Sequence, residues 1–193
     1  MILRHKLLAI SAVLIVATTL MIALLSGVYL LRSEQPLVRM MGGWLPVASV
    51  SGNTVSYGDY LTHVDAQRVF LTGPLAQDSG AVREITDSER REAYERAIRI
   101  RAVEGLAEEA DVEVTPLDVD RAYQDLVARA GSSTTKEEIQ TFLKAQFGWD
   151  ESEYKANLLR PAFTEEILRT KGGEEFDRLL QARIDGASRY LSF

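Results

Sequence analysis

VASVSGNTVSYGDYL (47–61) contains two short runs with β-branched residues, separated by the turn sequence Ser51-Gly52-Asn53. We predict two short strands joined as a hairpin, followed by a helix that begins at Ser56 and carries Asp59 in its first turn. A lone hairpin is marginally stable in water and needs a further strand or a covering helix. Because most of the chain after this stretch has helical spacing, the partner of the hairpin decides the fold.

The C-terminal stretch ASRYLSF (187–193) is the best candidate for that partner. Tyr190, Leu191 and Phe193 favour an extended segment over a helix end. We therefore predict a mainly α fold in which the N-terminal hairpin and the C-terminal strand form a small antiparallel sheet. The helices between these two ends would then close into one unit.

Start signals divide the chain between the hairpin and the tail into helices. An N-cap residue followed by an acid within the first turn is a typical start. Pro161 falls inside the fifth predicted helix and removes a backbone donor, so we expect a kink near residues 157–160. Residues 72–85 are predicted to form a loop, and residues 174–185 a last short helix. The five predicted starts are Ser56 with Asp59, Thr86 with Glu89, Thr115-Pro116 with Asp118, Thr134 or Thr135 with Glu137 or Glu138, and Asp150 with Glu153.

The N-terminus has a different composition. Residues 7–31 carry no charged side chain, and about 20 apolar residues are enough to cross a bilayer core. We predict a transmembrane signal anchor at 7–31, between a cytoplasmic n-region at 1–6 and a tether at 32–46. A buried core helix and a cleaved signal peptide are the alternatives. The prediction places the protein in the cell membrane as a single-pass protein, with its N-terminus cytoplasmic and its body, 47–193, extracytoplasmic.

Charge limits the partners of the body. The chain has 22 basic and 28 acidic side chains, and after residue 35 the net charge is −8. No stripe of Lys and Arg stands out, which argues against nucleic acid and against docking on anionic lipid. The chain contains no cysteine, which excludes disulfides and thiolate chemistry.

The sequence shows no catalytic constellation. Its two histidines, His5 and His63, are far apart, whereas a metal site needs three or four ligands at short spacings. The Gly42-Gly43 and Gly172-Gly173 pairs lack the context of a phosphate-binding loop, and no G-x-S-x-G motif occurs. We predict no catalytic residues, no metal and no cofactor.

Four segments, in this order, carry a resemblance to a known family. They are VASVSGNTVSYGDYL (47–61), VEVTPLDVDRAY (112–123), FGWDESEY (147–154) and LLQARIDGASRYLSF (179–193). Together they resemble the N-terminal chaperone domain of SurA- and PrsA-type exported foldases of the parvulin class. The resemblance covers most of the chain from residue 45 and implies a helical peptide-binding body whose C-terminal strand returns to the N-terminal hairpin.

One departure from that family bears on activity. Related foldases commonly carry a parvulin prolyl isomerase domain between the fifth-helix region and the C-terminal helix. Here Lys171-Gly172-Gly173-Glu174 occupies that junction. The resemblance therefore implies the chaperone body without its isomerase, and we predict that the chain is not an enzyme.

Two functions remain from this reasoning. The first is a membrane-anchored extracytoplasmic chaperone or holdase that binds unfolded or extended polypeptides in an apolar groove. The second is a structural or assembly subunit that binds one fixed partner; an active prolyl isomerase ranks third. The sequence leaves the oligomeric state open. Candidate groove residues, each of which could instead belong to the core, are Tyr60, Phe70, Tyr94, Phe147 and Trp149.

Overall fold

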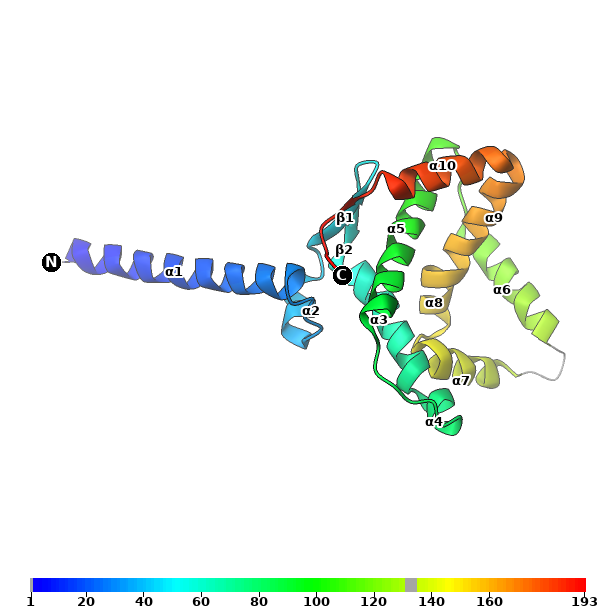
Figure 1. The fold of residues 1–193 in the computed structure, drawn as a ribbon, viewed down its shortest axis with the longest axis horizontal. Helices are drawn as coiled ribbons and strands as arrows, with labels where there is room; N and C mark the ends of the chain where they lie inside the picture. The colour runs from blue at the N-terminus through cyan, green and yellow to red at the C-terminus, as the bar shows by residue number, and fades with distance from the viewer. Residues whose placement is uncertain (1, 131–134) are drawn as a thin grey trace.

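A long N-terminal helix projects from a helical body that carries one small sheet (Figure 1). The computed structural model describes the backbone of residues 2–130 and 135–193, with all their side chains except those of 2–12, 75 and 130. In chain order the elements are α1 (Ile2–Tyr29), α2 (Pro36–Gly42), β1 (Pro46–Val50), β2 (Asn53–Ser56), α3 (Tyr57–Thr72), α4 (Pro74–Asp78), α5 (Asp87–Glu109), α6 (Pro116–Ala130), α7 (Lys136–Phe147), α8 (Glu151–Tyr154), the π-helix η1 (Lys155–Leu159), α9 (Arg160–Gly172), α10 (Glu174–Asp185) and β3 (Ser188–Arg189).

The sheet joins the two ends of the body, as predicted. Its strand order is β2-β1-β3, and both pairings are antiparallel. Ser51 and Gly52, both with positive φ, make the two-residue turn between β1 and β2, which suits the twist of a tight hairpin. On the other edge of β1, Ala48 pairs with Arg189. The third strand is shorter than the predicted tail, but the amide of Tyr190 extends the contact by donating to the carbonyl oxygen of Val47 at 2.9 Å.

The main core lies between this sheet and helices α3 and α5. Val47 and Val50 of β1 both belong to it although they are three positions apart, because the pairing register shifts between Pro46 and Ala48. Val47, Val55, Tyr60, Val64 and Ile98 are each fully buried there. Helices α9 and α10 close the core with Leu168, Phe176 and Leu180.

The predicted helix starts are confirmed. Four helices begin with the same reciprocal pair of hydrogen bonds. The side chain of the cap residue accepts from the backbone amide three positions on, and the side chain of that later residue accepts from the backbone amide of the cap. The four cap residues are Ser56, Thr86, Thr135 and Asp150. Thr115 and Asp118 make the same reciprocal pair at the start of α6. Thr134, the alternative start for α7, lies outside the described residues. The final helix has its predicted bounds.

The irregularity expected before Pro161 takes the form of the π-helix η1. The amide of Arg160 bonds to the carbonyl oxygen of Lys155, five residues earlier, so the turn is wider than in an α-helix. Proline has no amide hydrogen, and a widened turn accommodates both the missing donor and the ring. The chain passes from α8 through η1 into α9 without a break.

The predicted membrane segment is not supported. Crossing a bilayer takes about 20 consecutive apolar residues in one helix, and no helix within the described residues is both long and apolar enough. This finding overturns the predicted transmembrane anchor at 7–31. It also overturns the single-pass placement in the cell membrane, with a cytoplasmic N-terminus and an extracytoplasmic body. The end of α1 belongs to the core instead: Val28 is fully buried, and Leu24 packs against the same cluster.

The segment predicted as a tether also differs from the expectation. Residues 36–42 form α2, whose glycine at 42 lies against Val28 of α1. The carboxylate of Glu34 forms ion pairs with three arginines, Arg39 of α2, Arg68 of α3 and Arg90 of α5. These contacts fix the base of α1 to the body. The predicted loop at 72–85 likewise contains a short helix, α4.

Candidate functional site

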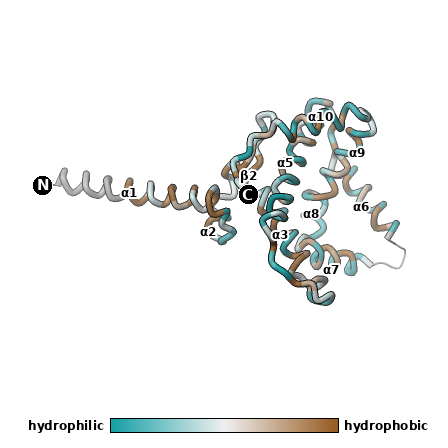
Figure 2. Tube along the Cα trace, in the orientation of Figure 1, coloured by the Kyte–Doolittle hydropathy of each residue, from teal (hydrophilic) through white to brown (hydrophobic). Residues whose placement is uncertain are grey.

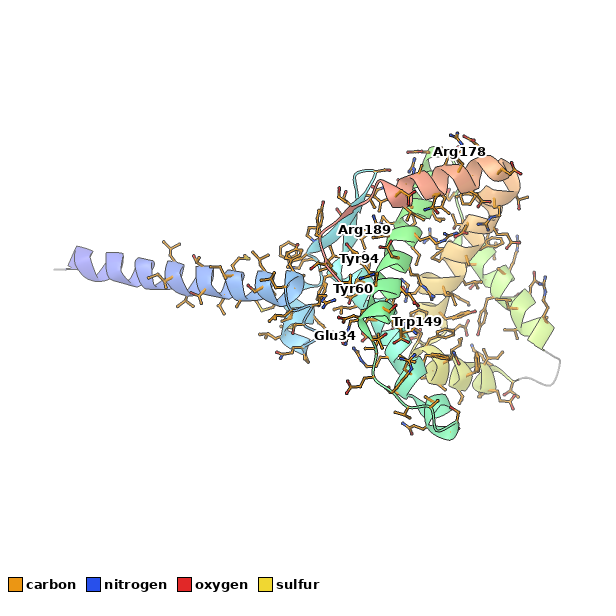
Figure 3. All side chains as sticks on the ribbon, viewed as in Figure 1. Glu34, Tyr60, Tyr94, Trp149, Arg178 and Arg189 are labelled. Carbon is orange, nitrogen blue, oxygen red and sulfur yellow. The ribbon has the colours of Figure 1, made fainter. Side chains whose placement is uncertain are left out.

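The five predicted groove residues fall into two groups. Tyr60 and Tyr94 lie in the core beside the sheet, whereas Trp149 lies in the junction of α7 with α8 (Figure 3). Phe70, Phe147 and Trp149 line one cavity of about 230 Å³ between α3, α5 and that junction. The structure therefore brings three of the five together and separates the other two from them.

Tyr60 and Tyr94 serve packing. They are 0% and 1% exposed, and their rings meet edge to face at 5.9 Å. The ring of Phe193 contacts both, at 6.2 Å and 5.4 Å, so the C-terminal tail covers them. Burial raises the pKa of Tyr60 to about 12. The sequence allowed each of these two residues to belong either to a groove or to the core, and the structure places both in the core.

A row of contacting aromatic rings runs from the cavity around Trp149 to a second cavity, which lies between α6 and α7. Trp149 stacks on Phe147 with their ring centroids 5.4 Å apart, and Phe147 contacts Tyr154 at 5.8 Å. Tyr154 in turn meets the ring of Tyr123 from α6 at 6.3 Å. The row ends at His63, whose ring lies 6.3 Å from that of Trp149.

The second cavity is an open apolar groove between α6, α7 and α8, which we call the α6–α7 groove. It has a volume of about 430 Å³, within the roughly 300–1,000 Å³ of typical ligand sites. Phe142 of α7 and Leu126 of α6 remain 55% and 43% exposed on its walls. Apolar residues recur along both helices in Figure 2. The groove is lined by Tyr123, Leu126, Val127, Glu138, Ile139, Phe142, Leu143 and Tyr154.

Sequence reasoning did not identify this groove. Helical spacing shows which residues of α6 and α7 share a face, but not what covers that face. In the structure the first half of α6 packs on η1 and α9 through Val119, Tyr123 and Leu159. In the second half, Val127 still packs against this cluster, whereas Leu126 is largely exposed among the described residues.

Three charged residues form ion pairs next to the groove. Lys155 of η1 reaches Asp120 of α6 at 2.8 Å and Glu151 of α8 at 2.5 Å. The same ammonium group lies 4.4 Å from the centre of the Tyr123 ring, a cation–π contact. Glu138 is the charged residue of the lining, and its pKa is lowered because its carboxylate caps the start of α7 at Thr135.

The other cavities are more polar. One of about 350 Å³ lies between α6 and α9, with Asp118, Arg121 and Arg129 on its walls. Another, of about 540 Å³, lies between α5 and the η1–α9 segment and carries Arg101, Glu104 and Arg160. Throughout the described part of the chain, no three His, Asp or Glu side chains come together as a metal site requires.

His63 lies at the inner end of the aromatic row and is 8% exposed. Desolvation lowers the pKa of its imidazole to about 4, and the charge of Arg96 adds to that effect. The ring is therefore neutral at pH 7. It packs on Trp149, and it lines the cavity that Phe70 and Phe147 share.

No family model, no curated protein and no solved structure matches this chain.

Proposed function

We propose that this protein is a chaperone of the holdase type, which binds extended or unfolded polypeptide segments in the α6–α7 groove. The observation that carries the proposal is the exposure of Phe142 and Leu126 on opposite walls of one apolar hollow. Exposed apolar surface of this kind, bordered by polar residues, is typical of a site that binds protein. The resemblance of four segments to SurA- and PrsA-type chaperone domains supports the same function.

The chemistry of the lining favours low sequence specificity. Specific ligand sites combine an apolar wall with several fixed polar groups that orient the ligand. Here the wall is aliphatic and aromatic, and Glu138, the charged residue in the lining, is already bonded to the backbone and hydroxyl of Thr135. Apolar side chains of a client would be bound by burial, at about 25 cal/mol for each Å² removed from water.

The proposal includes no catalytic step. The junction where related foldases carry their isomerase domain is here the tight passage from α9 to α10 through Gly173. We propose that binding alone keeps clients from aggregating, and that the chain does not accelerate exchange at X-Pro bonds.

Dilution of a chemically unfolded client into buffer tests the proposal. With the full chain present, light scattering should fall in proportion to its concentration for several unrelated clients. An X-Pro peptide isomerisation assay run beside it should stay at the rate of the buffer. No suppression at a tenfold excess, together with tight binding to one folded partner, would favour the assembly-subunit alternative.

A further inference from the structure

One lysine connects η1, α6 and α8 beside the α6–α7 groove. Lys155 belongs to η1, and its ammonium group contacts Asp120 and the ring of Tyr123 on α6 as well as Glu151 on α8. Its side chain is 19% exposed, so these contacts are partly shielded from water. Shielding strengthens an ion pair relative to one on the open surface.

The position of this contact along α6 is informative. Val119 and Tyr123, in the first half of α6, are 5% and 9% exposed, whereas Leu126, one turn further, is 43% exposed. Lys155 therefore contacts α6 where its packed half gives way to the half that forms a groove wall. A change of tilt at this point moves Leu126 and Val127 relative to Phe142 on the opposite wall.

The backbone that presents Lys155 is unusual. Lys155 is the first residue of η1, and π-helices occur mostly as single-turn bulges inside α-helices, frequently at functional sites. Leu159, at the end of the same turn, is buried in the cluster that holds Val119 and Tyr123. One π-turn thus holds α6 by an apolar contact at Leu159 and by a charged contact at Lys155.

We propose that Lys155 is the positioning residue that fixes α6 at a set distance from α7 and thereby sets the width of the groove. This inference rests on the proposed function for its purpose, but the geometry can be tested without any client. Loss of the ammonium group frees the second half of α6, and the groove then accepts a wider range of apolar segments with less affinity for each.

The absence of cysteine from the chain makes a distance measurement straightforward. Spin labels on cysteines introduced at Gln124 and Thr141, both exposed, report the separation of α6 and α7 by pulsed electron resonance. We expect a narrow distance distribution in the otherwise unchanged protein and a broad one in Lys155→Met. Lys155→Arg, which keeps the charge and can still lie over the Tyr123 ring, should restore the narrow distribution.

Lys136→Met is the matched control. Lys136 also pairs with Glu151, at 3.8 Å, but its side chain is 71% exposed. It should leave the distribution unchanged. If Lys155→Met does not fold, Asp120→Asn breaks the same contact from a side chain that is 52% exposed and should broaden the distribution in its place.

Binding of a fluorescent apolar peptide gives the functional readout. Lys155→Met should weaken binding at least threefold, while Lys155→Arg and Lys136→Met stay within a factor of two of the unmodified protein. An unchanged distance distribution in both Lys155→Met and Asp120→Asn would overturn the inference. If the distribution broadens but the unmodified protein binds no peptide, the positioning role stands and the proposed function fails.

Discussion

The hydroxyl of Tyr94 on α5 donates a hydrogen bond of 2.5 Å to the carbonyl oxygen of Val47 on β1. Both residues are buried, at 1% and 0% exposure. The same hydroxyl accepts a hydrogen bond from the amide of Tyr190, at 3.3 Å, and that amide also donates to Val47. The hydroxyl group of Tyr94 thus links helix α5, the hairpin and the C-terminal tail through hydrogen bonds.

Removal of that hydroxyl tests this junction. Tyr94→Phe should lower the free energy of unfolding by about 1 kcal/mol, because the ring stays in place while the hydrogen bond to Val47 and the longer one from the amide of Tyr190 are lost. Urea unfolding followed by circular dichroism measures the change. Tyr190→Phe is the control, since the side chain of Tyr190 is 47% exposed and should change stability little. Equal midpoints for Tyr94→Phe and the unmodified protein would contradict this assignment.

The C-terminal tail should stabilise the fold through the burial of its side chains as well as through its backbone hydrogen bonds. Leu191 follows β3 and is 6% exposed in the main core. Leu191→Ala should cost about 2–5 kcal/mol, the usual range for a large core residue replaced by alanine. Ser192→Ala, at an exposed neighbouring position, should cost close to nothing. A melting temperature of Leu191→Ala equal to that of Ser192→Ala would show that the tail does not close the body.

Stability between pH 5 and pH 7.5 should depend on His63. In the unfolded chain its imidazole titrates near pH 6.5, whereas in the folded protein burial lowers its pKa to about 4. Between these values the unfolded state binds more protons, so stability falls as the pH is lowered from 6.5 towards 4 and is fully present above 6.5. We expect a loss of about 2 kcal/mol between pH 7.5 and pH 5.

Two variants identify the histidine responsible. His63→Gln should remove most of that pH dependence, whereas His5→Gln, which changes the only other histidine, should keep it. Urea midpoints at the two pH values give the comparison. The same slope in His63→Gln as in the unmodified protein would assign the pH dependence to other groups.

Local signals predicted much of this fold. Reciprocal caps such as Ser56 with Asp59 act within one turn, so the sequence alone determines where those helices begin. The pairing of 187–193 with the hairpin could also be predicted, because a short hairpin needs a third strand and the tail is rich in aromatic residues. The predicted anchor at 7–31 was wrong, because no helix within the described residues is long and apolar enough to cross a bilayer. The packing of Val28 into the core is a non-local contact that composition does not show.

The groove depends on relations that are not local. Leu126 and Phe142 fit their helical stripes as well as any core residue, and their exposure follows from how far α6 stands from α7. That separation depends on a contact of Lys155 with Asp120, 35 positions away, and on a π-turn that Pro161 suggested only as a kink. Phe147 and Trp149, which the sequence singled out at a helix junction, line the neighbouring cavity with Phe70 and not this groove.

A matched pair of leucines shows whether the α6–α7 groove binds apolar polypeptide segments, as proposed. Leu126 in the groove and Leu179 on α10 are 43% and 42% exposed, so Leu126→Ser and Leu179→Ser should lose similar, small amounts of stability. Titration of a fluorescent apolar peptide into each full-length variant should show at least fivefold weaker binding for Leu126→Ser and unchanged binding for Leu179→Ser. Equal affinities for the two variants, with both folded, would show that peptides do not bind in this groove.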